Sequence, residues 1–322
     1  MVAAALDVGG SHVVILTNGT GFSDQAATIS RWPRDRVHFQ VSCDGLAPRH
    51  DHMRGPGAFA RLIEDLAAVR RLGFGLTLSF CPTTENLADL PAMVAVAASV
   101  GAAGLHCMWH FAAGRGRDDA RPDTDALFAA VIETATLAEA AGIAFDNLAA
   151  LASQVFSPAG TRHDGVTAGW ESVAIGPDDR LYPSPALIGE AAVATPLAEP
   201  GGLEAGWRMS PVLDGLRRLT VAGTTSPWRY ILGGPDPDHA FRHDGRFDGE
   251  DPYLPLRQRL AAWSILREAS AVPEARPERP GVRLKMGETH ESCHAHGEVA
   301  LAHTNCLLSL ADNASLGHIK DF

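Results

Sequence analysis

Short apolar runs alternate with longer helix-like segments through the first half of this chain, and that alternation restricts its fold more than any other feature. Runs rich in β-branched and apolar residues lie at 12–17, 36–43, 75–81 and 104–109. Segments with apolar residues at helical spacing lie at 56–72, 85–100 and 123–141, and each is followed by a glycine. Strands that alternate with helices predict βαβ units and a parallel sheet. We expect both faces of these strands to be apolar, because helices cover a parallel sheet.

Each expected strand is followed by polar or turn-forming residues. In barrels and in open α/β sheets, ligands bind beyond the carboxyl ends of the strands. These segments therefore predict one edge of a binding site, made by residues 18–20, 42–45, 81–83 and 109–110.

The pattern changes near residue 153. Residues 172–187 predict a hairpin around 176–179, because Gly, Pro and Asp reach turn conformations at little cost. A short helix is expected within 206–220 and a longer one over 254–269, with a Gly-, Pro- and Asp-rich stretch between them. Residues 273–280 have the Pro, Glu and Arg content of a linker.

Composition excludes several classes of function. The chain has 322 residues and a formal net charge of −11, which disfavours a nucleic-acid partner because phosphate binding needs a basic surface. No window approaches about 18 consecutive apolar residues, so no membrane span is expected. The apolar start lacks the basic flank of a signal peptide. The 5 cysteines are widely spaced and odd in number, which predicts reduced thiols and a cytoplasmic protein.

Three stretches of the first half match one known family in order and spacing. Residues 41–45 (VSCDG), with His50-Asp51 and Arg54-Gly55 after them, resemble the VSLDG…HD…RG stretch of radical S-adenosylmethionine (SAM) enzymes that carry a SPASM-type C-terminal extension. Residues 15–20 (ILTNGT) resemble the third barrel strand of that family, and residues 83–91 (TTENLADLP) resemble the segment after its fifth strand. The resemblance implies an α/β fold with a partial TIM-type parallel barrel over residues 1–150.

The resemblance continues more weakly into the second half. Residues 176–187 (GPDDRLYPSPAL) look like the SPASM hairpin, and residues 227–234 look like its Cys-rich segment. This implies a small, degenerate SPASM-like α+β region over 151–272. A linker and a tail rich in His and Cys then occupy 273–322.

The resemblance implies SAM and a [4Fe–4S] cluster as cofactors, but the cluster ligands are not present. The family holds its cluster with a Cys-x3-Cys-x2-Cys triad, and this sequence contains none. Where the SPASM region would carry cysteines, the chain has residues that cannot supply the thiolates such clusters need: Ser184, Gly223, Ser226, Leu232 and Asp236.

Two explanations of this pattern fit the sequence. The chain is a fragment of an enzyme that modifies a peptide or a small molecule, and is inactive alone. Alternatively it is a pseudoenzyme, a non-catalytic binding or scaffold subunit. A half-barrel leaves an open sheet edge, which predicts either a missing piece of the barrel or a protein partner that covers the edge.

The family places a Ser and an Asp of its fourth barrel strand near the ribose of SAM. Carried over by position, that role falls to Ser42 and Asp44, with Asn18 as a further candidate. The alternative is that Asp44-Gly45 only ends a strand and that Asn18-Gly19 is an ordinary turn.

The tail contains His-x2-Cys twice, at His290/Cys293 and at His303/Cys306. Two imidazoles and two thiolates can complete a tetrahedral zinc site, so the tail predicts zinc binding. The alternative is that Cys306 packs within an apolar strand at 306–310 while the histidines lie in solvent.

Overall fold

The structure is a computed structural model that describes residues 2–7, 12–113, 121–156, 167–197 and 202–271. It divides into two compact units, Met1–Ile265 and Leu266–Phe322. Every strand in the described residues lies in the first unit.

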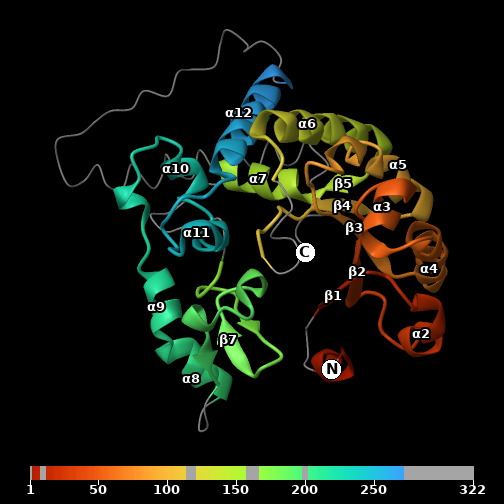
Figure 1. Ribbon diagram of the computed structural model, residues 1–322, viewed down its shortest axis with the longest axis horizontal. Coiled ribbons are helices and arrows are strands. Elements are labelled where there is room, and N and C mark those ends of the chain that lie inside the picture. The colour runs from red at the N-terminus through yellow and green to blue at the C-terminus, as the bar shows by residue number, and fades with distance from the viewer. Residues whose placement is uncertain (1, 8–11, 114–120, 157–166, 198–201, 272–322) are drawn as a thin grey trace, which may run out of the picture. The chain divides into compact units, whose positions relative to one another are not determined.

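A five-stranded parallel sheet forms the centre of the first half (Figure 1). Its order follows the sequence, β1 (Val13–Thr17), β2 (Val37–Ser42), β3 (Gly75–Phe80), β4 (Gly104–Cys107) and β5 (Ala144–Phe145). Neighbouring strands that follow one another in this order and in parallel make up a barrel, so the sheet is a partial barrel. The four strands expected from the sequence are confirmed, whereas β5 has 2 residues and gives no readable pattern.

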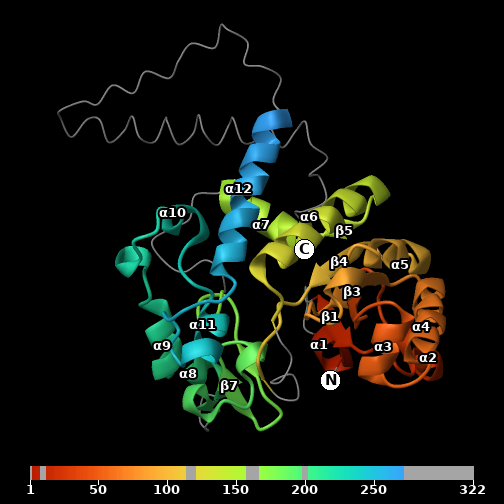
Figure 2. The ribbon, with the colours of Figure 1, turned by 45° about the horizontal axis from the view of Figure 1, so that its top comes forward.

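Helices pack on one side of the sheet, as both ribbon views show (Figures 1 and 2). They are α2 (Phe22–Ile29), α3 (Ala47–Arg54), α4 (Ala58–Leu72), α5 (Met93–Val100) and α6 (Thr124–Ala141). Strand side chains that face them, such as Phe39, Leu78 and Leu105, are at most 1% exposed. Burial of this apolar surface, at about 25 cal/mol per Å², is the main force that holds the helices on the sheet.

The segment expected as one helix over 85–100 is a 3₁₀ turn at Leu87–Asp89 followed by α5. The reason is local, because the side chains of Asn86 and Asp89 bond to the backbone of neighbouring loops instead of lying on a helix surface. Gly73, Gly101 and Gly142 end α4, α5 and α6 with positive φ, as the sequence predicts.

The other face of the sheet is polar on three strands but carries Val14 and Leu16 on β1, so the expectation that both faces are apolar holds there only for β1. On β2, β3 and β4 this face carries His38, Gln40, Ser42, Thr77, Ser79 and His106. The Nε2 atom of His38 lies 2.9 Å from Thr77 Oγ1, and Gln40 Nε2 donates to Ser79 Oγ at 3.3 Å. We call this surface the polar face. It corresponds to the inside of a barrel.

The second half begins with a small antiparallel sheet of β6 (Ala174–Ile175), β7 (Arg180–Tyr182) and β8 (Thr195–Pro196). The predicted hairpin is confirmed, with Asp179 in its turn at φ 55°. The helix expected at 206–220 is two helices, α8 (Gly202–Met209) and α9 (Pro211–Arg217). They separate at Ser210, whose hydroxyl accepts from the backbone N–H of Leu213 at 3.2 Å.

The remaining helices are α1 (Val2–Asp7), α7 (Asp146–Phe156), α10 (Arg229–Leu232), α11 (Pro237–Asp244) and α12 (Leu254–Ala271). Single 3₁₀ turns lie at Pro185–Leu187, Ala191–Val193 and Val221–Gly223. The expected helix over 254–269 is thereby confirmed.

The main hydrophobic core extends across both halves of the first unit. It joins strand residues to Leu232 of α10, to Tyr253 in the loop before α12 and to Leu256 at the start of α12. The Tyr253 hydroxyl donates to the backbone carbonyl of His110 at 3.1 Å. The domain boundaries at residues 150 and 272 stay a prediction.

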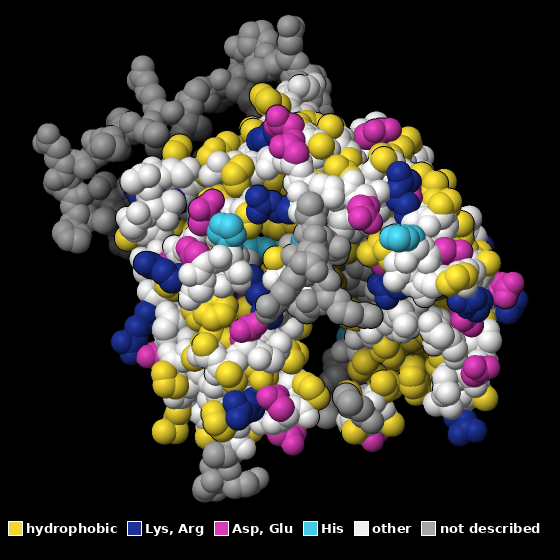
Figure 3. Space-filling view, viewed as in Figure 1, with side chains coloured by type: hydrophobic (Ala, Val, Ile, Leu, Met, Phe, Trp, Pro, Cys, Tyr) yellow, Lys and Arg dark blue, Asp and Glu magenta, His cyan; other side chains and the backbone are white. Residues whose placement is uncertain are grey.

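Among the helices that the structure describes, none is long and apolar enough to cross a membrane. Acidic and basic side chains are interspersed on the face shown in Figure 3.

Candidate functional site

The carboxyl ends of β1, β2 and β3 lie side by side. Thr17 pairs with Val41, and Ser42 pairs with Ser79. Asn18, Asp44 and Cys81 follow these strands. They therefore lie together at the carboxyl end of the sheet, where the sequence predicts a site.

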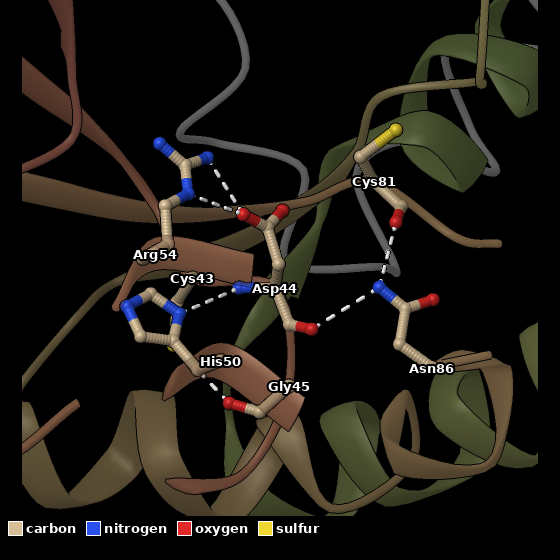
Figure 4. A network of polar contacts seen from close by, with 7 residues as sticks. All are labelled: Cys43, Asp44, Gly45, His50, Arg54, Cys81 and Asn86. Atoms are coloured by element: carbon tan, nitrogen blue, oxygen red, sulfur yellow. Dashed lines mark hydrogen bonds and ion pairs between the residues drawn. The ribbon is translucent and has the colours of Figure 1, made fainter. Parts of the chain in front are cut away.

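Asp44 is the centre of a buried hydrogen-bond network at this edge (Figure 4). Its Oδ2 atom accepts from Arg54 Nε at 2.9 Å and from Arg54 Nη2 at 2.6 Å. Its backbone N–H donates to His50 Nδ1 at 3.1 Å. The Asp44 side chain is only 3% exposed, so the paired guanidinium compensates the cost of burying its charge. This arrangement matches the interpretation of Asp44 as a strand-ending residue, and contact with a ribose stays a prediction.

Asn86 connects two strand ends within the same network. Its Nδ2 donates to the carbonyls of Asp44, at 3.1 Å, and Cys81, at 2.9 Å. Its Oδ1 accepts from the backbone N–H and the hydroxyl of Thr83, at 2.7 and 3.1 Å. Asn86 is fully buried, so all four contacts replace hydrogen bonds that water cannot make there.

The His-Asp pair that follows β2 is structural. Burial lowers the pKa of His50, which keeps the ring neutral and able to accept the Asp44 N–H. Asp51 accepts from the N–H groups of Phe59 and Gly57 at the start of α4, and these bonds lower the pKa of its carboxyl. Neither residue is oriented as a metal ligand.

Asn18 and Ser42 remain open to solvent to different degrees. Asn18 is exposed, and its Oδ1 accepts from the Thr20 N–H at 3.1 Å, as in an ordinary turn. Gly19 is required beside it, because a Cβ there would lie 2.6 Å from Leu62 Cδ1 and φ is +78°. Ser42 is half-buried at the end of the polar face, and among the described residues nothing hydrogen-bonds its hydroxyl.

The described donor set does not fit an iron–sulfur cluster. Cys43 and Cys107 are buried in the core, and burial raises the pKa of Cys43 to about 12. Within the described ranges, no group of three His, Cys, Asp or Glu residues is placed to hold a metal ion. At the SPASM positions, Leu232 packs in the core and the Asp236 carboxylate caps α11 by accepting from the Asp238 N–H at 2.9 Å.

The predicted zinc ligands His290, Cys293, His303 and Cys306 lie outside the residues that the structure describes. Zinc binding by the tail therefore stays a prediction.

Sequence reasoning did not find several residues that build this edge. Arg54, Asn86 and Asp89 all lie within the stretches that carry the family resemblance, and Asp89 accepts from the Leu46 N–H at 2.9 Å. Charged and amide side chains recur in those stretches without helical spacing. That pattern could have indicated side chains that bond to loops. A shallow pocket of about 300 Å³ adjoins the network, lined by Pro48, Arg49, His52, Met53, Glu85 and Asn86.

Comparison with known proteins finds partial matches to this chain. No family model matches the chain. It is similar to an AdoMet-dependent heme synthase of Methanosarcina barkeri, with 30% identity over 115 residues. It is also similar to Streptococcus suis SuiB bound to S-adenosylmethionine, with a TM-score of 0.55 and 12% identity. This chain is related to the radical SAM family.

The relationship covers only parts of these proteins. The alignment spans 33% of this chain and 31% of the heme synthase, so the chain matches about a third of that relative. The SuiB match covers 73% of this chain and 57% of SuiB, and a second SuiB structure gives a TM-score of 0.58 at 12% identity, over 74% and 59%. At that identity the likeness shows a shared fold.

Proposed function

We propose that this chain binds S-adenosylmethionine on the polar face, beside the ends of β1 and β2. It would serve as the binding part of a SPASM-type protein that modifies a peptide or a small molecule. The observation that carries the proposal is the Ser42 hydroxyl, which lies at the edge of a polar face and has no hydrogen-bond partner among the described residues. The likeness to SuiB, whose structure holds this ligand, supports it.

The chemistry of the polar face suits this ligand. S-adenosylmethionine presents ribose hydroxyls, an amino-acid group and an adenine ring, and it supplies a sulfonium centre that activates its methyl and adenosyl groups. The hydroxyl of Ser42, the amide of Gln40 and the imidazole of His38 are groups that can hydrogen-bond such a ligand. Buried Asp44 would hold the strand end in place through Arg54. No radical step is assigned, because the described cysteines do not fit a cluster.

Isothermal titration of the purified chain with S-adenosylmethionine tests this proposal. We expect saturable binding, which Ser42→Ala weakens by about threefold to tenfold, the equivalent of one hydrogen bond of about 1 kcal/mol. Ser99→Ala is the matched control, because Ser99 is exposed on α5 and its hydroxyl donates only to Val96 O. Absence of binding at about 1 mM ligand, or equal affinity of the two variants, would refute the proposal.

The open edge of the sheet favours a second function, docking of a partner protein. In the described residues β1 pairs only with β2, and Val14 and Leu16 on β1 are 53% and 60% exposed. Figure 3 shows hydrophobic side chains gathered between the segments of β1, α1 and α2. An edge strand with apolar side chains accepts an extended apolar segment from another protein.

A photo-crosslinking residue at position 14, used in cells, tests this second function. We expect one crosslinked peptide with alternating apolar residues, identified by mass spectrometry. The same probe at Leu137, which is 43% exposed on α6, is the control. Equal crosslinking at both positions argues against docking at the β1 edge.

A further inference from the structure

A histidine–carboxylate pair lies on the polar face, away from the Asp44 network. His106 belongs to β4, and Asp146 directly follows β5. His106 Nδ1 lies 2.8 Å from Asp146 Oδ1, and the two side chains are 28% and 50% exposed. The pair is therefore held at hydrogen-bond distance while remaining open to a ligand.

The carboxylate determines which ring nitrogen of His106 carries the proton. A carboxylate only accepts, so Nδ1 must donate to it, and in the neutral ring Nε2 then carries the lone pair. Among the described residues nothing bonds to Nε2.

The neighbours of the pair fix its geometry. Asn147 follows Asp146, and Cys107 follows His106 in the chain. Asn147 Oδ1 accepts from the Cys107 N–H at 2.6 Å, and its Nδ2 donates to the Cys107 carbonyl at 2.8 Å. These two hydrogen bonds join the residues that follow Asp146 and His106, and so hold the Asp146 carboxylate beside the His106 ring. Asn147 is thus a positioning residue for the pair.

Two hydroxyls continue the line of the pair across the sheet. Ser42 is the register partner of Ser79, and Ser79 is the register partner of His106. Since register partners on neighbouring strands share a face, the three side chains form one row. Ser79, between the other two, is 6% exposed. A ligand along this row would therefore meet the Ser42 hydroxyl at one end and the His106 imidazole at the other.

We propose that His106 and Asp146 form a general-base pair for a ligand that carries a hydroxyl or an amine. The X–H bond of the ligand breaks, its proton forms a bond to Nε2, and the electron pair stays on the ligand atom. Asp146 stabilises the resulting imidazolium, as a carboxylate does for a catalytic histidine. The assignment does not require S-adenosylmethionine, and its test uses none.

Modification by diethyl pyrocarbonate measures this property directly, since the reagent acylates an imidazole nitrogen that carries a lone pair. The rate at His106, read by mass spectrometry, is divided by the rate at exposed His52 in the same sample. We expect Asp146→Asn to lower this ratio by about tenfold or more, because an amide can donate to Nδ1 and turn the lone pair inward. Asp146→Glu should recover part of the ratio, and Asp24→Asn on α2 should leave it unchanged.

A second measurement uses the unaltered chain and so does not depend on the folding of any variant. Nitrogen-15 NMR of the histidine rings should show His106 with a proton on Nδ1 and none on Nε2. A proton on Nε2, or an unchanged modification ratio in a folded Asp146→Asn chain, overturns the proposal.

Discussion

Replacement of Asn86 by alanine tests whether the strand ends are held by one side chain. Asn86 is fully buried and makes four hydrogen bonds to Asp44, Cys81 and Thr83. Asn86→Ala removes all four, so the carbonyls of Asp44 and Cys81 and the N–H and hydroxyl of Thr83 each lose a hydrogen bond in a buried region. Each lost bond of this kind costs about 1 kcal/mol, so the free energy of unfolding should fall by about 3–4 kcal/mol.

Urea unfolding followed by tryptophan fluorescence measures that loss. The matched control is Asn18→Ala, which removes one exposed bond to the Thr20 N–H and should cost about 0.5 kcal/mol. Asn86→Asp keeps the acceptor for Thr83 but cannot donate to the two carbonyls, so it should also be strongly destabilising. A loss below about 1 kcal/mol for Asn86→Ala, or one equal to that of Asn18→Ala, would refute this account of the strand ends.

Three further predictions concern pH, thiol reactivity and metal. Burial and the nearby Asp236 charge raise the pKa of Asp238 from 3.8 to about 7. The folded chain thus holds a proton that the unfolded chain has lost, so stability should fall as the pH rises from about 4 to about 7, and Asp238→Asn should flatten that slope in pH-dependent urea unfolding. Burial raises the pKa of Cys43 to about 12, so iodoacetamide at pH 8 should label Cys43 only after urea is added. If the tail binds zinc, elemental analysis should find about one zinc per chain, and His290→Ala with Cys293→Ala should remove it; less than about 0.5 zinc in the unaltered chain argues against the site.

The sequence was sufficient for four of the five strands of the parallel sheet and for the glycines that end α4, α5 and α6. Apolar runs such as 36–43 are distinct from the helix that ends before Gly73, because burial imposes a different period on each. β5 was missed because Ala144 and Phe145 are too few to show any period. The broken helix at 85–100 was missed because Asn86 and Asp89 serve neighbouring loops, and such contacts leave no periodic signal.

Side-chain partners were much harder to read. The sequence indicated Asp44 but not Arg54 as its partner, since the pairing depends on how α3 returns to the strand end. The polar face was missed although His38, Gln40 and Ser42 alternate with Val37, Phe39 and Val41. The prediction of two apolar faces rested on the apolar residues of that alternation. His106 and Asp146 lie 40 residues apart, so only the sheet brings them together.

A crystal structure of the chain with S-adenosylmethionine tests the central proposal most directly. The account predicts the ligand on the polar face, within hydrogen-bond distance of Ser42 Oγ, with the Asp44–Arg54 pair unchanged behind it. A ligand bound elsewhere, or crystals that exclude it at saturating concentration, would contradict the proposed site.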